Sequence, residues 1–328
     1  MYWKKHKGFI LQLIFAAICL GFIIQFLFKE KAEVKKIVHI LAHTDLRWLA
    51  LGIGLCFLQA FWQGLMYVLA FRTIGASIKI TDAIALYLKR NTAGVFMPAG
   101  GVTSLALFAE QLERKGISKE QSYAGSSIYG FCGILTVAII AIPTLGYLSL
   151  HSAVLKSEVA SLVGVLALLA AIAALIVSGL KKGLAYRLLA KFVPSLPDFM
   201  ERIRRFTFSK KYFVAVVGFS MCVEFTGVAY LYTAMHAADD KVSLFTAVVG
   251  YAIAILVYTI SPFMEGTGAV EIVLVFILKS FGYTTSQAVS ITLIFRFFQF
   301  WFIILMGIVP LVTQNINRLK GGKEAGAG

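Results

Sequence analysis

Long apolar runs separated by short charged segments make up most of the chain. About 18 consecutive apolar residues are enough for a helix to cross the hydrocarbon core of a membrane. Six runs reach this length and predict full transmembrane helices, at residues 9–28, 48–71, 123–150, 159–180, 212–235 and 287–310. We therefore expect an all-α polytopic membrane protein, folded as a single transmembrane domain over residues 1–328.

Two further apolar regions, residues 82–110 and 244–280, are interrupted by polar and helix-breaking residues. The first contains Lys89–Asn91 and Pro98–Gly101, and the second contains Ser261–Glu271. Irregular backbone and charge are tolerated at membrane depth only where protein or water surrounds them. We therefore predict that each region forms a re-entrant hairpin of broken helices and lines a polar site.

The two broken regions resemble each other at a nearly constant spacing along the chain. The alignment pairs Phe96–Gly101 with Phe263–Gly268, Gly116–Ser118 with Gly282–Thr284, and Gln121 with Gln287. It predicts an internal repeat whose halves are residues 48–150 and 212–310.

Charged loops predict that the two halves have opposite orientations. Basic residues flank the first broken region, whereas the loop at residues 236–241, before the second, is acidic. Because cytoplasmic loops are enriched in Lys and Arg, the first hairpin should open to the cytoplasm and the second to the outside. Inverted repeats of broken helices that meet near the membrane midplane are typical of transporters.

The same charge rule orients the remaining segments. The basic loop at residues 181–211 is expected in the cytoplasm, and so are both termini. Residues 9–28 would then be an N-terminal anchor helix, and the Gly-rich tail at residues 314–328 is expected to be disordered.

Composition agrees with a membrane protein and argues against a nucleic-acid-binding one. The chain is 59% hydrophobic, and its 31 Lys and Arg against 16 Asp and Glu give a net charge of +15. In a membrane protein this excess reflects the positive-inside bias and attraction to anionic phospholipid headgroups. No basic motif with interleaved aromatic residues lies outside the spans, so we expect no nucleic-acid partner.

Motifs for catalysis, metal binding and nucleotide binding are missing from the sequence. The four cysteines lie inside apolar runs without a CxxC pair, and the five histidines lie near helix ends or in loops. There is no Walker loop and no Ser/His/Asp set within a span. We therefore expect no cofactor, no metal, no catalytic residue and no enzymatic activity.

Glu271 and Arg296 are the strongest candidates for a functional role. Each side chain is costly in hydrocarbon alone, and an ion pair between them would reduce that cost. The pair could pin the second hairpin to the last helix, contact a substrate, or do both. Arg90 could hold a lipid phosphate or extend to the inner interface. Glu224 could meet a cationic group or make an interhelical hydrogen bond.

The full set of candidate residues shares a position in or beside the two broken regions, or in the middle of a span. The candidate lipid-headgroup residues are Arg90, Asn91, Gly100, Gly101, Glu224, Glu265, Gly266, Gly268, Glu271 and Arg296.

The pattern Pro262-x-x-Glu265-Gly266-x-Gly268-x-x-Glu271, followed by Gly282 and Leu293–Arg296, resembles the lysylphosphatidylglycerol synthase transmembrane region, a flippase-like family. Asn91 and Pro98–Gly101 resemble the matching part of the first half. The resemblance implies a bacterial inner-membrane protein that moves aminoacyl-phosphatidylglycerol between leaflets. In such proteins a separate soluble domain makes that lipid. The chain ends shortly after its last predicted span, so we expect no lysyltransferase activity from it.

Other functions remain open from the sequence. The chain could transport another amphiphile, such as a polyprenyl-linked sugar, or a small ion. It could instead be the membrane subunit of a phosphatidylglycerol lysyltransferase system, with a separate aminoacyl-lipid synthase as partner. It could also be a scaffold whose polar pairs are structural, and a homo-oligomer is compatible with each of these functions.

Overall fold

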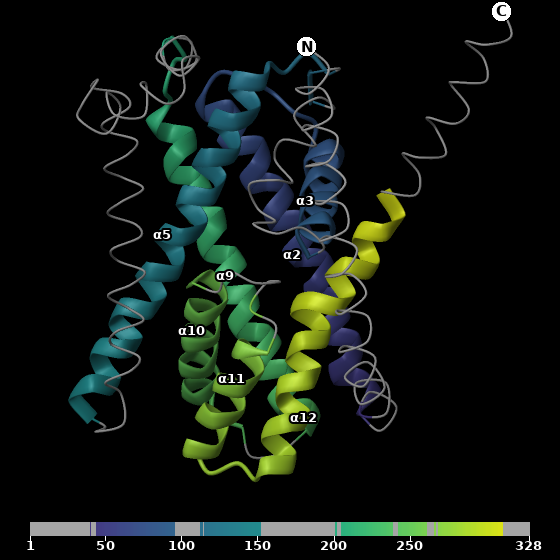
Figure 1. Ribbon diagram of the computed structural model, residues 1–328, viewed down its shortest axis with the longest axis vertical. Helices are drawn as coiled ribbons and strands as arrows, with labels where there is room; N and C mark the ends of the chain where they lie inside the picture. The colour runs from purple at the N-terminus through teal and green to yellow at the C-terminus, as the bar shows by residue number, and fades with distance from the viewer. Residues whose placement is uncertain are drawn as a thin grey trace, which may run out of the picture.

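The computed structural model describes residues 40, 44–95, 112–113, 115–151, 201, 205–238, 242–260, 266 and 268–310. These residues form helices and connecting turns without any strand, which confirms the all-α fold class within the described part. The elements are α2 (Leu46–Thr73), α3 (Ile80–Val95), α5 (Lys119–His151), α9 (Lys210–Ala238), α10 (Leu244–Ile260), α11 (Ala269–Ser280), α12 (Thr285–Arg296) and the π-helical segment η2 (Phe297–Trp301) (Figure 1).

Four described helices are long and apolar enough to cross a membrane. They cover Leu46–Thr73, Lys119–Leu148, Lys210–Ala238 and Thr285–Pro310, the last of which includes η2. Each coincides with one of the predicted spans, so the chain is a multi-pass membrane protein. The predicted spans at residues 9–28 and 159–180 lie outside the described residues, as do most of the basic loop and the whole tail.

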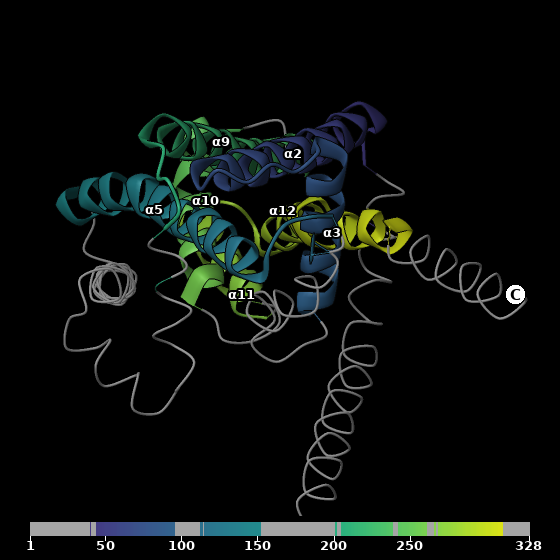
Figure 2. The ribbon, with the colours of Figure 1, turned by 90° about the horizontal axis from the view of Figure 1, so that it is seen from above.

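Helices α2 and α9 lie side by side and run in opposite directions. The end of α2 meets the start of α9, where the Ser209 N–H donates to the Thr73 carbonyl at 2.9 Å. The start of α2 meets the end of α9, where the Trp48 and His236 rings stack with centroids 4.4 Å apart. Figure 2 shows this pair on one side of the bundle, with α10, α11 and α12 on the other.

Helices α10 and α11 form a hairpin of two half-length helices. They contain 17 and 12 residues, which at 1.5 Å per residue is shorter than the hydrocarbon core of about 30 Å. Figure 1 shows α10 running inward from the end of the bundle where α9 ends, with α11 returning beside it. The interrupted pattern of residues 244–280 predicts this shape, and its re-entrant position in a bilayer stays a prediction.

Helix α3 enters the bundle from the opposite end to the α10–α11 hairpin (Figure 1). It packs against the last span, because a Cβ on Gly307 would overlap Thr92 Oγ1 and lie 2.7 Å from the Leu88 carbonyl. The glycine therefore permits the close crossing of the two helices. The rest of the first broken region, from residue 96 to residue 111, lies outside the described residues.

The two halves share one local structure in detail, the turn before α5 and before α12. Ser118 and Gln121 form reciprocal N-terminal hydrogen bonds of 3.0 and 3.2 Å, and Thr284 and Gln287 form the same pair at 2.9 and 3.3 Å. A glycine with positive φ precedes each, at 82° for Gly116 and 92° for Gly282. The two turns therefore have the same capping structure, while the internal repeat itself stays a prediction.

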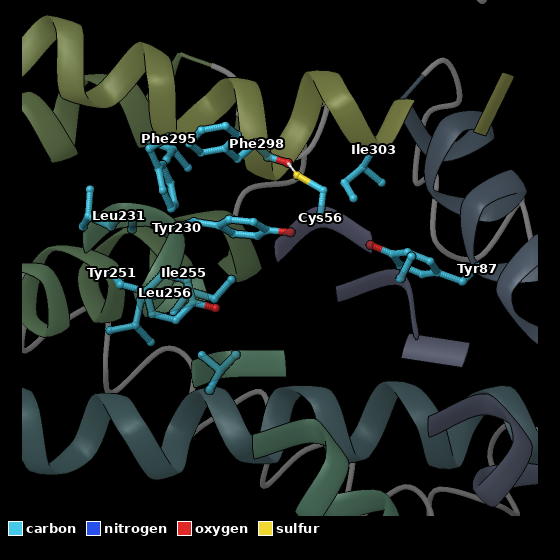
Figure 3. Close-up of a cluster of buried hydrophobic side chains, with 14 of the residues drawn as sticks. Cys56, Tyr87, Tyr230, Leu231, Tyr251, Ile255, Leu256, Phe295, Phe298 and Ile303 are labelled. Atoms are coloured by element: carbon cyan, nitrogen blue, oxygen red, sulfur yellow. Dashed lines mark hydrogen bonds between the residues drawn. The ribbon is translucent and has the colours of Figure 1, made fainter. Parts of the chain in front are cut away.

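The core joins α2, α9, α10 and the last span. Figure 3 shows Tyr230 of α9 beside Phe295 of α12 and Phe298 of η2, with its hydroxyl toward Cys56 of α2. The Phe298 ring packs so closely on α2 that a Cβ on Gly52 would overlap it, and the Cys56 thiol lies 3.4 Å from the Phe298 carbonyl. These contacts fix the position of η2. They therefore also fix Arg296, which directly precedes it.

Candidate functional site

Glu271 lies in the first turn of α11 and makes two different contacts through its two oxygens. Its Oε2 accepts the Gly268 N–H at 2.5 Å, and its Oε1 lies 2.5 Å from Arg296 Nε. The first contact caps the helix, where a carboxylate is favoured by the exposed N–H groups and the helix dipole. One carboxylate therefore orders the end of the hairpin turn and binds it to the last span.

Arg296 is held from two sides in the interior. Its side chain is 1% exposed and that of Glu271 is 16% exposed. On the other side its guanidinium carbon lies 4.6 Å from the Phe300 ring centroid. A buried charge is stabilised by such a pair and by an aromatic face. The predicted ion pair is thus present, and it does join the second hairpin to the last helix.

The backbone changes from α to π geometry directly after Arg296. The Phe302 N–H bonds to the Phe297 carbonyl, five residues earlier, at the end of η2. Such single-turn π segments shift the register of the side chains that follow and often occur at functional sites. Phe300, four residues after Arg296 and inside this segment, lies over its guanidinium.

Two glycines shape the turn that precedes Glu271. Gly266 and Gly268 have φ values of 74° and 88°, which residues with a Cβ rarely adopt. A Cβ on Gly266 would also lie 2.8 Å from Val270 Cγ2 and 3.2 Å from Tyr258 Cα. Gly266 is therefore required by both its conformation and the close approach of α10, whereas Glu265 lies outside the described residues.

Arg90 lies in the first half of the molecule, over a pair of aromatic rings. The Tyr67 and Tyr129 rings stack with centroids 3.9 Å apart, and the Arg90 guanidinium carbon lies 5.5 and 6.0 Å from them. Tyr129 donates a hydrogen bond to Gln63 Oε1. Arg90 therefore faces an aromatic platform built by α2 and α5. Asn91 follows it as a half-buried residue, and Gly100 and Gly101 lie outside the described residues.

Glu224 lies in a third place and is 4% exposed. Its Oε2 accepts a hydrogen bond from the Tyr251 hydroxyl at 2.8 Å, and its Oε1 lies 3.4 Å from Thr136 Oγ1. Among the described residues it forms no ion pair with Arg90 or Arg296. The interhelical hydrogen bond considered for Glu224 is therefore the contact that the structure shows.

Sequence reasoning missed several polar residues around these sites. Tyr251, Thr136, Ser220, Tyr67 and Tyr129 were indistinguishable from ordinary packing residues in apolar helices. A usable signal was present only for the tyrosines, because a buried phenol usually has a hydrogen-bond partner. Which partner each one meets depends on how the helices are rotated against one another.

Comparison with known proteins identifies the family of this chain. A comparison with curated proteins finds no match. The family model described as "Lysylphosphatidylglycerol synthase TM region" matches residues 9–307. This match includes three of the described spans whole and the last as far as residue 307, together with the α10–α11 hairpin and the Glu271–Arg296 pair. The chain therefore belongs to the lysylphosphatidylglycerol synthase transmembrane-region family.

Proposed function

We propose that this protein translocates a phospholipid, aminoacyl-phosphatidylglycerol or a similar lipid, between the two leaflets of the bacterial inner membrane. The observation that carries the proposal is the Glu271–Arg296 pair, buried where a broken hairpin meets a π segment of the last span. Family membership supports a link to aminoacyl-phosphatidylglycerol.

The chemistry of the pair suits an aminoacylated headgroup. Such a headgroup carries an anionic phosphate and a cationic ammonium. The phosphate would bind the guanidinium of Arg296, which matches phosphate geometry, and the ammonium would bind the carboxylate of Glu271. An incoming headgroup could thus exchange partners with the ion pair without leaving either buried charge unpaired.

The arrangement of the helices supports one further part of the proposal. The α10–α11 hairpin and α3 enter from opposite ends of the bundle, as re-entrant hairpins of an inverted repeat would. Arg90, on its aromatic platform, would contact the phosphate in the first half. We further propose six full spans, cytoplasmic termini and no enzymatic activity, with the lipid supplied by a separate synthase.

The test uses the purified full chain in vesicles that contain lysyl-phosphatidylglycerol in the inner leaflet only. A membrane-impermeant amine reagent then measures the lipid that reaches the outer leaflet. Wild type should raise the labelled fraction over time above that of protein-free vesicles. Arg296→Ala should abolish this increase, and Lys279→Ala, at an exposed residue at the end of α11, should not.

Other outcomes separate the alternatives. If neither this lipid nor any other phospholipid is moved, the proposal is lost. Movement of a polyprenyl-linked sugar in its place would identify a transporter of another amphiphile. Lysyl transfer to phosphatidylglycerol only when the chain is combined with a soluble synthase would favour a synthase subunit, a role that the description of the family also suggests.

A further inference from the structure

A cluster of hydroxyl groups surrounds Glu224 where three helices meet. Thr136 comes from α5, Ser220 and Glu224 from α9, and Tyr251 from α10. All four residues are buried, with exposures of 0%, 1%, 4% and 3% in that order. Beyond the contacts of Glu224 itself, Thr136 Oγ1 lies 2.7 Å from Ser220 Oγ.

No cation faces this carboxyl in the described part of the chain. Of the titratable groups there, the Tyr251 phenol of α10 interacts with Glu224 directly, and the Tyr230 and Tyr258 phenols lie beyond it. Helix α5 presents the Thr136 hydroxyl. Helices α2 and α12 also pack against α9 but present no charged side chain to Glu224. A carboxylate buried with only neutral donors is costly, so the neutral form competes with it.

The hydroxyl groups can satisfy both forms of the carboxyl. In the ionised form, Tyr251 donates to Oε2, Thr136 donates to Oε1, and Ser220 donates to Thr136 Oγ1. After a proton binds at Oε1, Glu224 donates to Thr136 Oγ1, and the two hydroxyls turn to the main chain. Thr136 Oγ1 then has the Gly133 carbonyl at 3.0 Å, and Ser220 Oγ has the Cys132 carbonyl at 3.3 Å.

No buried donor of the cluster is left without an acceptor in either form, because a hydroxyl both donates and accepts and can rotate. The cluster can therefore bind and release a proton without leaving a buried donor unpaired, as a reversible proton site requires. An ion pair lacks this property, since protonating the acid leaves its cation unpaired.

The cluster is also connected to the α10–α11 hairpin. Tyr251 belongs to its first helix, and a Cβ on Gly227 of α9 would overlap the Tyr251 ring, so the phenol is seated directly on the α9 backbone. On its other side Tyr251 meets Phe295, with ring centroids 6.5 Å apart. Phe295 immediately precedes Arg296. A change in the protonation of Glu224 would thus affect both the hairpin, through Tyr251, and Arg296, the residue proposed to hold the headgroup.

We propose that Glu224 is a reversible proton-binding site inside the membrane-spanning bundle, and that proton binding there is coupled to movement of the lipid. The coupling rests on the proposed function, whereas the proton site does not. The Thr136 and Ser220 hydroxyls reverse direction when the proton binds, and Tyr251 transmits the change to the hairpin.

The proton site is tested by infrared difference spectroscopy of the full chain in vesicles, titrated with pH. Wild type should show a protonated carboxyl band that Glu224→Gln removes. Glu113→Gln, which changes an exposed carboxyl, should retain it. In Tyr251→Phe and Thr136→Val the carboxyl stays but loses a hydrogen-bond partner, so the band should shift in frequency. A band that persists in Glu224→Gln, or that neither of these two variants shifts, overturns the proposal.

The coupling is tested in the lipid-labelling assay with an imposed pH gradient. The wild-type rate should change several-fold with the direction of the gradient, and the Glu224→Gln rate should not depend on it. A wild type that moves lipid at the same rate in every gradient overturns the coupling and leaves the lipid proposal standing. A chain that titrates at Glu224 but moves no lipid supports the proton site and overturns the lipid proposal.

Discussion

Glu271 Oε1 lies 2.5 Å from Arg296 Nε, so the first turn of α11 and the residue before η2 are joined by one buried ion pair. Along the chain the two residues are separated by most of α11, the turn between α11 and α12, and nearly all of α12. Because Glu271 also caps α11 at Gly268, the same carboxylate sets both the shape of the hairpin end and its attachment.

Removing one charge of this pair should destabilise the protein more than removing both. Glu271→Gln keeps an acceptor for the Gly268 N–H but leaves the guanidinium without its carboxylate, which should cost about 3 to 5 kcal/mol. The double variant Glu271→Gln/Arg296→Met should recover much of this loss. Thermal unfolding in detergent of wild type, Glu271→Gln, Arg296→Met and the double variant gives the coupling energy. Simple additivity of the two substitutions would contradict the prediction.

Gly266→Ala should destabilise the protein more than Gly282→Ala does. Both glycines have positive φ, at 74° and 92°, so each substitution carries a conformational cost of about 1 to 2 kcal/mol. Only the Cβ at position 266 meets neighbours, at 2.8 Å from Val270 Cγ2, whereas nothing lies within 4 Å of the Cβ at position 282. Melting temperatures measure the difference, and equal losses would show that the contact with the hairpin is unimportant.

Gly52→Ala should disturb the π segment, and Gly54→Ala should not. A Cβ at position 52 would overlap the Phe298 ring, whereas the site at position 54 is open. Alanine at an open helical site stabilises by up to about 1 kcal/mol relative to glycine. Gly52→Ala should therefore lower the melting temperature, and adding Phe298→Leu should restore part of it. The absence of any rescue would argue against Phe298 as the cause.

Ser118→Ala and Thr284→Ala should have similar effects, because the two residues make the same capping contacts at the starts of α5 and α12. Each loses the hydroxyl that accepts the N–H of a glutamine, at 3.2 Å in the first half and 3.3 Å in the second. Loss of such a cap costs about 1 kcal/mol, whereas Ser118→Thr and Thr284→Ser keep the hydroxyl and should be nearly neutral. Denaturation in a mild detergent measures each change. A clear effect in one half alone would contradict the structural equivalence of the two turns.

The hydrophobic pattern was sufficient to predict much of the fold. Its apolar runs predicted the four described spans, and its breaks predicted where α10 ends and α11 begins. The cost of an isolated charge in hydrocarbon was enough to pair Glu271 with Arg296 from the sequence alone. These predictions succeeded because span length and charge burial are constrained by the bilayer, whatever the arrangement of the helices.

The tertiary structure decided which residues share a site. Glu224 meets Tyr251, 27 residues later, and Thr136, 88 residues earlier, and neither spacing is visible as a pattern in the chain. Arg90 likewise rests on rings from two other helices. By itself the sequence determined which segments are helical, where they break and which charges need partners. Only the rotation and crossing of the packed helices, set by close approaches such as those at Gly52 and Gly227, decided which partners those charges have.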